Sequence, residues 1–530
     1  MSRPRKNLPL PVNGPIQRRE PKPFPTPSKA LAHAEKLLQE CGLPASLASG
    51  AHSGAHSIAA STAASTSAPI EAQAGGREAH RAADSASTTP AEEWARSGAM
   101  YLSGTADGPP EFAAGALATA ARGAEVALRA LSPGNVFAHL DAPALLGERA
   151  AIAGLSRRGD VSCGGAARLL TAQNGVIAVH LPREVDWQSL PAWLEIAADP
   201  VWKSESDLHA EPRWRALAEA IQSQDVARLV DRARLLGLAV AEAPRNLPAP
   251  EQIGALAHFS HGSEVAPRPT GAFTQIGSDR PLRLLDLSTL WAGPLAADLL
   301  AECGIEVLKI ESPDRPDGAR LGPAAFFDLM HGRKQGCALD LKAPGDRNRF
   351  EAILEHADLV IESARPRALS QLGYDAPSWV SAKPGRIWAS ITGYGRADPG
   401  IAFGDDAGVA AGLGWALQEN ESPAETPTFC GDAVADPLTG MHLAALVLGG
   451  LRKGRGGLLD IALRDVAAYS ARASQENLVA PRERTAEGWQ LRLAEGAVQV
   501  AAPRARAAQG QAPPLASISD QALRAWTNPC

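Results

Sequence analysis

Through the second half of the chain, short apolar runs of strand length alternate with longer segments of helical spacing. The strand-like runs include LRLLDLSTL (282–290), IEVLKIE (305–311) and RIWASITGYG (386–395), and the helix-like ones include PLAADLLAECG (294–304) and RNRFEAILEHA (347–357). Strands joined by helical crossovers are parallel neighbours in one sheet. Because the strand-like runs are almost wholly apolar, we expect helices on both faces of that sheet. The pattern predicts an α/β fold with a Rossmann-like parallel-sheet domain.

The length of the chain indicates more than one domain. It has 530 residues, and a single hydrophobic core rarely grows beyond about 250–300 residues. We assign the Rossmann-like domain to residues 280–480 and a smaller α/β domain to residues 91–250. Residues 1–90 are predicted to be a disordered arm, a short helix and a linker, because most of this segment lacks large apolar side chains. Residues 251–279 would form a second linker, and residues 481–530 a C-terminal tail.

Composition and charge exclude several classes of function. The formal net charge is −6 and the pI about 6.1, which gives no electrostatic reason to expect nucleic acid or an anionic membrane as a partner. No apolar run approaches the ~20 residues that span a bilayer, and the basic N-terminus lacks the apolar centre of a signal peptide. The six cysteines are scattered without metal-ligand spacing. We therefore expect reduced thiols, no metal site and a cytoplasmic location.

A series of motifs in the second half resembles the class III CoA-transferase family, which includes formyl-CoA and carnitine CoA-transferases and α-methylacyl-CoA racemase. The motifs follow one another in the family's order. They are LLDLSTLWAGPLAADLLAECGIEVLKIESPDRPDGAR (284–320), ALDLK (338–342), HADLVIESARPRALSQLGYD (356–375), SITGYG (390–395), GDAVADPLTGMHLAALVLGGL (431–451) and GRGGLLDIALRDVAAYS (454–470). Each motif alone is weak, and the complete ordered series makes the resemblance specific.

The resemblance continues in the first half, in an unusual order. Residues 156–250 resemble the family's small domain, which normally follows the nucleophile. Residues 97–123 resemble the stretch that leads into the catalytic aspartate, and Thr119 falls where the aspartate would stand. These likenesses imply a duplication with complementary losses, so that residues 91–250 hold a degenerate repeat and the small domain. Chance similarity between two segments rich in Ala and Gly is the alternative.

The resemblance implies that Asp436, in ADPLTGMH, is the catalytic nucleophile. In this family an aspartate carboxylate attacks the acyl-CoA thioester, and the released CoA thiolate converts the resulting mixed anhydride into an aspartyl-CoA thioester. A carboxylate suits this role because its ordinary pKa of about 3.9 keeps it ionised at neutral pH, and the N-terminus of the following helix stabilises an anion. A helix cap is the alternative role for Asp436. Asp432 is a weaker candidate for the nucleophile.

The family also uses a glycine-rich loop of the small domain, which closes over the aspartyl intermediate. The best local match is SRRGDVSCGG, with Gly164 and Gly165 at its end. Their backbone N–H groups could stabilise a developing oxyanion. An ordinary turn before the next strand is the alternative for this segment.

CoA requires cations for its phosphates and a cleft for its adenine. The residues that the resemblance and the local charges place at the CoA site are Leu290, Trp291, Ala292, Arg315, Arg320, Ser363, Arg365 and Arg367. Two positions that are often basic in the family are Ser312 and Gln371 here, so the nearby arginines would have to replace them. Trp291 stands where formyl-CoA transferase has a polar residue, which favours a bulkier, more apolar acyl group than formate or oxalate.

These observations together predict an acyl-CoA:carboxylate CoA-transferase with acyl-CoA as substrate, no permanently bound cofactor and a homodimeric assembly like that of the family. A degenerate paralogue that binds CoA esters without turnover is the main alternative. Racemisation is disfavoured because Asp405 occupies the position of the racemase histidine, and His442 is interpreted as a packing residue. A nicotinamide-dependent enzyme is excluded because STLWAGP replaces the GxGxxG motif after the first strand.

Overall fold

The computed structural model describes residues 28–49, 88–197, 202, 210–252, 256–268, 273–274, 280–365 and 368–527. The predicted disordered arm and most of the first predicted linker lie outside these residues.

A seven-stranded sheet forms the centre of the second half, in the order β4-β10-β9-β8-β5-β6-β7. All neighbouring pairs are parallel except the edge pair of β10 and β4. The strands are β4 (His258–Ser260), β5 (Arg283–Leu287), β6 (Glu306–Glu311), β7 (Gln335–Ala338), β8 (Leu359–Glu362), β9 (Ile387–Thr392) and β10 (Gly457–Ala462). The predicted Rossmann-like sheet is therefore confirmed. It gains β4 from a segment that the sequence indicated only as a linker.

Helices cover both faces of this sheet, as the apolar strands predicted. Adjacent strand residues point to opposite sides, so Leu284 packs in the larger core and Leu285 in the smaller one. The larger core holds α10 (Ala292–Glu302), α11 (Ala324–His331), α16 (Ala435–Lys453) and α17 (Leu463–Ala471). The opposite face is covered by α12 (Pro344–His356), α14 (Ala376–Ala382) and α18 (Asp520–Thr527), with the short α13 (Ala368–Gln371) beside them.

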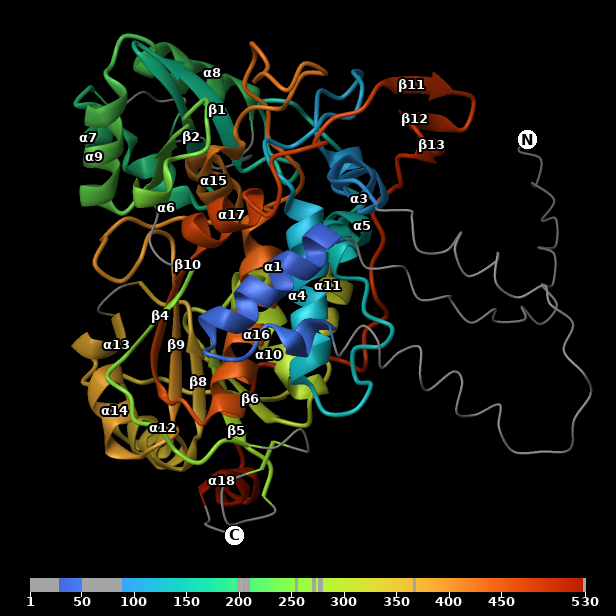
Figure 1. The fold of residues 1–530 in the computed structure, drawn as a ribbon. Helices are drawn as coiled ribbons and strands as arrows, with labels where there is room; N and C mark the ends of the chain where they lie inside the picture. The colour runs from blue at the N-terminus through green and yellow to red at the C-terminus, as the bar shows by residue number, and fades with distance from the viewer. Residues whose placement is uncertain are drawn as a thin grey trace, which may run out of the picture.

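The smaller α/β unit lies above the sheet in Figure 1, at the upper left. Its antiparallel sheet has the order β1-β2-β3. One face packs on a core rich in tryptophan, and the other face packs on Val409, Trp415 and Phe429 from the second half of the chain. The elements are β1 (Ala167–Ala172), β2 (Gly175–His180), α6 (Glu184–Gln188), α7 (Leu190–Leu194), α8 (Glu211–Ile221), α9 (Val226–Leu236) and β3 (Ala239–Glu242).

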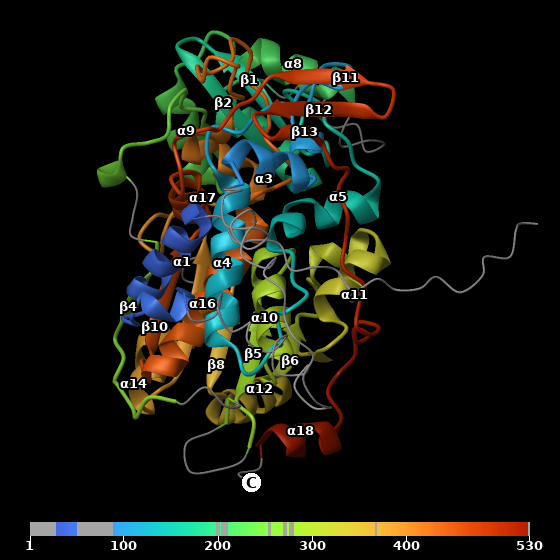
Figure 2. The ribbon, with the colours of Figure 1, turned by 45° about the vertical axis from the view of Figure 1, so that its right-hand side comes forward.

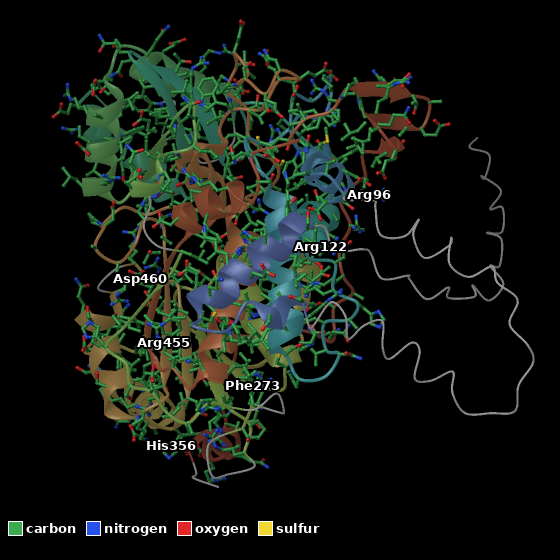
Figure 3. The ribbon with its side chains drawn as sticks, viewed as in Figure 1. Arg96, Arg122, Phe273, His356, Arg455 and Asp460 are labelled. Carbon is green, nitrogen blue, oxygen red and sulfur yellow. The ribbon has the colours of Figure 1, made fainter. Side chains whose placement is uncertain are left out.

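Helices from the front of the chain lie over α16 (Figures 1 and 2). They are α1 (Ser28–Glu40) and α4 (Leu117–Leu131), with α3 (Pro90–Arg96) and α5 (Glu148–Ala153) close by. His33 of α1 and His442 of α16 are buried, and their Nε2 atoms lie 2.9 Å apart. Arg122 of α4, labelled in Figure 3, pairs with Glu125 at 2.7 Å and with Asp141 at 2.9 Å. The front helices are thus part of the main core.

The C-terminal segment ties the two ends of the molecule together. It begins with a small sheet that the sequence did not predict, made of β11 (Arg482–Thr485), β12 (Gly488–Leu493) and β13 (Gly496–Gln499). Figure 2 shows the chain running from β13 along one side of the molecule to α18. On the way Arg506 pairs with Glu148 at 2.8 Å, and Trp526 of α18 is buried. None of the helices in the described residues is both long enough and apolar enough to cross a membrane.

Candidate active site

Asp436 lies in the first turn of α16, directly after a tight turn. Gly431 and Ala433 in that turn have left-handed backbone conformations, with φ of 75° and 46°. The N-cap of α16 is Val434, and no side chain caps this helix. Asp436 therefore does not act as a helix cap. Among the contacts between described residues its carboxylate accepts no hydrogen bond, so the oxygens of this half-buried group are available to react.

Three further aspartates are buried around Asp436. Asp405 and Asp406 belong to α15 (Gly404–Gly408), and Asp432 belongs to the turn before α16. Asp405 Oδ1 accepts a hydrogen bond from the N–H of Ala433 at 3.0 Å. This bond links α15 to the turn at residues 431–433, which precedes Asp436. Asp432 and Asp406 are held by Arg149 and His180, respectively.

The electrostatics of this group differ from the sequence-based expectation of an aspartate with an ordinary pKa. Burial is the main cause that raises the pKa of Asp436 to about 7. The guanidinium of Arg149 opposes the shift, and the charges of Asp405, Asp406 and Asp432 add to it. Burial also raises the pKa of Asp405. Asp436, the predicted nucleophile, is thus a carboxylate whose ionisation falls near neutral pH.

Arg149 comes from α5, in the front half of the chain, and its side chain contacts Asp432 in the turn before α16. Its Nε donates to Asp432 Oδ2 at 2.9 Å, and its Nη2 donates to Asp432 Oδ1 at 2.5 Å. This fork fixes the buried carboxylate of Asp432 bidentately. The same guanidinium lies 5.6 Å from the ring centroid of Trp291. Asp432 thus has a structural partner of its own, which makes it less available than Asp436 as a nucleophile.

His180 is a second group that the small unit contributes. It ends β2, and its Nδ1 lies 3.0 Å from Asp406 Oδ1. Its ring packs on Phe403, with ring centroids 4.6 Å apart. Asp406 also accepts a hydrogen bond from the N–H of Phe403 at 3.0 Å. This contact joins the end of β2 in the small unit to α15, beside Asp436.

The predicted glycine loop lies at the same place. A Cβ on Gly164 would be 3.7 Å from Arg149 Nη2, and the neighbouring Cys163 Sγ lies 3.4 Å from the carbonyl oxygen of Gly431. Gly165 has a left-handed conformation with φ of 82° and donates its N–H to the carbonyl of Ser162 at 2.8 Å. The loop is therefore a tight turn, which was the alternative interpretation. It also packs against the turn at residues 431–433, directly before the helix that carries Asp436.

The loop after β5 approaches the nucleophile helix from the other side. Leu290 is left-handed with φ of 69°, Trp291 is the N-cap of α10, and Ala292 begins that helix. The close approach of α16 to this loop requires Gly440, because a Cβ there would be 2.7 Å from the carbonyl oxygen of Ala292. The predicted residues 290–292 and the predicted nucleophile are thus brought together.

A fully buried ion pair supports this loop. The N–H of Leu290 donates to Asp317 Oδ1 at 2.9 Å, and Asp317 pairs with Lys309 at 3.0 Å. Lys309 also donates to the carbonyl of Ser288. Both members of the pair are inaccessible to solvent. The left-handed turn at Leu290 is therefore held by charges that water does not screen.

Ser363 marks the point where the strand order reverses. β5 and β8 are adjacent, and the later strands extend from them in opposite directions. The N–H of Thr289 donates to Ser363 Oγ at 3.0 Å, which joins the loops that follow these two strands. In open α/β sheets ligands bind at such a switch point, outside the carboxyl ends of the strands.

Arginines gather beside this switch point. Partial burial and the neighbouring charges of Arg183 and Arg315 lower the pKa of Arg365. A Cβ on Gly237 of the small unit would be 3.0 Å from Arg365 Nη1. Within the described residues neither Arg315 nor Arg365 forms an ion pair, so the cluster has positive charge available for an anion.

The other two arginines predicted at the CoA site, Arg320 and Arg367, give no further free positive charge in the described residues. Arg320 is paired with Glu311 at 2.6 Å and donates to the carbonyl of Pro513 at 3.0 Å, which leaves fewer donors for a ligand. Arg367 lies outside the described residues.

The sequence did not single out Arg149, His180, Arg183 or Gly404. The first three belong to the front half of the chain, and no motif connects them with Asp436. Gly404 directly precedes Asp405, the residue that occupies the position of the racemase histidine. The tertiary fold alone brings these residues to the site.

Comparison with known proteins identifies the second half of the chain. The model of CoA-transferase family III matches residues 280–499. Over these residues the chain is similar to CoA-transferase family III. The match includes the sheet from β5 to β10, the loop at Trp291 and the nucleophile candidate Asp436.

The chain is also similar to individual proteins. A succinate–glutarate CoA-transferase of Agrobacterium fabrum is 30% identical over 38% of this chain and 55% of the relative, and a succinyl-CoA–D-citramalate CoA-transferase of Chloroflexus aurantiacus is 28% identical over 35% and 49%. The chain thus spans about half the length of the curated relatives it matches. A crystal structure of a CAIB/BAIF family protein from Brucella suis covers 40% of this chain and 64% of that chain, with 23% identity and a TM-score of 0.34.

Proposed function

We propose that this protein is an acyl-CoA:carboxylate CoA-transferase that works through a covalent aspartyl-CoA thioester on Asp436. The observation that carries the proposal is the carboxylate of Asp436. It is half-buried, makes no hydrogen bond within the described residues, and lies where the family III loop at Trp291 and the glycine loop converge.

The chemistry requires only carboxylate and thiolate nucleophiles. A carboxylate oxygen of Asp436 attacks the thioester carbonyl carbon, the C–S bond breaks, and CoA leaves as a thiolate. The thiolate attacks the aspartyl carbonyl of the mixed anhydride, which releases the first acid and leaves an aspartyl-CoA thioester. An accepting carboxylate repeats the sequence in reverse and leaves with CoA. No step requires a bound cofactor.

The surroundings of Asp436 support this sequence. The N-terminus of α16 favours negative charge, so it assists ionisation of a group whose pKa lies near 7. The N–H group of Gly164 is our candidate for stabilising the tetrahedral oxyanions, because the N–H of Gly165 already donates to the carbonyl of Ser162. The loop at 290–292 would hold the pantetheine arm at the switch point, with the arginines at 183, 315 and 365 on the phosphates.

The names of the relatives suggest the first substrates to test. They include enzymes that act on succinate, glutarate, D-citramalate, L-malate and oxalate. Succinyl-CoA is therefore the first donor to try, with a panel of short mono- and dicarboxylic acids as acceptors. Transfer of CoA to an acid, followed by chromatography of the CoA esters, tests the activity. Binding of succinyl-CoA without transfer to any acid would favour the degenerate paralogue.

We further propose that one chain supplies a complete site. Arg149, Cys163 and His180 come from the front half and contact residues of the second half. Leu417 donates its N–H to the carbonyl of Phe112 at 2.8 Å. A direct hydrogen bond therefore joins residues 97–123 to roughly residues 407–440, the two segments that we infer to be copies of one another. A homodimer, as in the family, stays a prediction, which light scattering can test.

A further inference from the structure

Arg149 has N–H donors that are not hydrogen-bonded to Asp432. An arginine has five N–H donors, and the contacts with Asp432 involve Nε and Nη2. Within the described residues Nη1 has no hydrogen-bond partner. The side chain is 31% exposed, whereas Asp432 is fully buried. One edge of the guanidinium is therefore fixed, and the other is accessible.

Two residues flank the guanidinium of Arg149, a glycine and a flat indole. On one side is Gly164, where even an added Cβ would stay 3.7 Å from Nη2, so no side chain of residue 164 covers the guanidinium. On another is the indole of Trp291, 5.6 Å from the guanidinium carbon. The planar fork of arginine matches a carboxylate, with two N–H donors facing two oxygens.

The site loses one negative charge during the proposed reaction, and this lowers the repulsion that an incoming carboxylate meets. In the free protein, Asp436 adds its own negative charge to that of the three neighbouring aspartates. In the aspartyl-CoA intermediate that charge is gone, since the carboxylate has become a thioester. Asp432 is paired with Arg149, and Asp406 faces His180. An accepting carboxylate meets less repulsion at this stage than before acylation.

We propose that Arg149 binds the carboxylate of the accepting acid through its Nη1 edge. This inference rests on the proposed function and adds the residue that recognises the second substrate. Arg149 stays protonated throughout and only donates hydrogen bonds. One oxygen of the bound acid attacks the aspartyl carbonyl carbon, the C–S bond breaks, and CoA leaves as a thiolate.

The test separates the two half-reactions. Protein is first converted to the adduct with succinyl-CoA, and discharge of the adduct is then followed by intact-mass spectrometry at increasing succinate concentration. The informative variant is the double replacement R149Q/D432N, because removing Arg149 alone would leave the buried charge of Asp432 unpaired. The pair R228Q/E195Q, which removes an exposed arginine–carboxylate pair of the small unit, is the matched control.

We expect the succinate concentration for half-maximal discharge to rise at least tenfold in R149Q/D432N. The discharge rate at saturating succinate should fall by a smaller factor, and the control should match the wild type. If the double variant does not fold, R149K replaces it, and a rise of at least threefold is expected because the charge remains without the fork. An unchanged succinate dependence overturns the proposal, as does an equal loss of adduct formation and discharge. A wild-type protein that forms no adduct with any acyl-CoA overturns the proposed function itself.

Discussion

The carboxylate of Asp436 lies directly against the Cα of Gly404. A Cβ on Gly404 would overlap Oδ2 of Asp436 and come within 2.8 Å of its Cγ. It would also lie 2.7 Å from the carbonyl oxygen of Ala433. Real Cβ atoms do not approach other atoms this closely, so any side chain at residue 404 would displace the carboxylate of Asp436.

The variant G404A should therefore lose activity through a shift of Asp436. A misplacement of about 1 Å can cost on the order of 100-fold in rate, and we expect a loss of that order in adduct formation. Gly408 in the same helix provides the control, because a Cβ there would be 3.8 Å from Val434 Cγ2, an ordinary contact. Single-turnover adduct formation measures both variants. Wild-type rates in G404A would show that the carboxylate does not react from the observed position.

Adduct formation should depend on pH because only the ionised carboxylate attacks. With the pKa of Asp436 raised to about 7, the rate should rise from pH 6 to pH 8 and be about a tenth of its maximum at pH 6. The variant D405N removes a negative charge that raises this pKa, while its side-chain oxygen can still accept the hydrogen bond from Ala433. Its pH profile should therefore move to lower pH. A profile that moves to higher pH, or does not move, would contradict the electrostatic account.

The buried pair of Lys309 and Asp317 should affect both stability and CoA binding. Removing one member of a buried pair costs about 3–5 kcal/mol, so D317N should lower the free energy of unfolding by about that amount. It should also raise KM for acyl-CoA, because the N–H of Leu290 loses a charged acceptor. The exposed pair of Lys342 and Asp314 is the control, and D314N should leave both quantities nearly unchanged. Denaturant unfolding and steady-state kinetics measure these effects.

Two arginines near the switch point should behave differently. Arg365 has no ion-pair partner within the described residues and faces Arg183 and Arg315, so R365Q should raise KM for acyl-CoA several-fold with little change in stability. Arg320 is paired with Glu311, so R320Q should reduce stability more than it changes KM. Thermal melts and kinetics in parallel distinguish the two cases. The reverse pattern would place the phosphates at Arg320.

The sequence predicted the sheet well because its strands carry their own signal. Runs such as LRLLDLSTL and IEVLKIE are apolar on both faces, and the first is followed by a helix of clear periodicity. The helix α11, which follows IEVLKIE after a loop, was not predicted. The edge strand β4 was missed because its three residues, HFS, do not differ from a linker. The small sheet β11–β13 was missed because its strands are short and partly exposed, and β11, RERT, consists mostly of charged residues.

The site was predicted only in part, for a different physical reason. Asp436 and the loop at Trp291 lie within motifs, so local sequence was enough to propose them. Arg149 and His180 are brought to Asp436 by packing between distant segments, which no local pattern encodes. The raised pKa of Asp436 is likewise a consequence of burial and of three neighbouring carboxylates. The sequence around Asp436 suggested only an aspartate near a helix N-terminus.

The most direct test of the account is peptide mass spectrometry of the wild-type protein after incubation with succinyl-CoA. The account predicts a CoA adduct that hydroxylamine removes and that maps to the peptide containing Asp436. The variant D436N, with CoA-ester binding retained, should form none. An adduct on another residue, or undiminished CoA transfer by D436N, would contradict the assignment of Asp436 as the nucleophile.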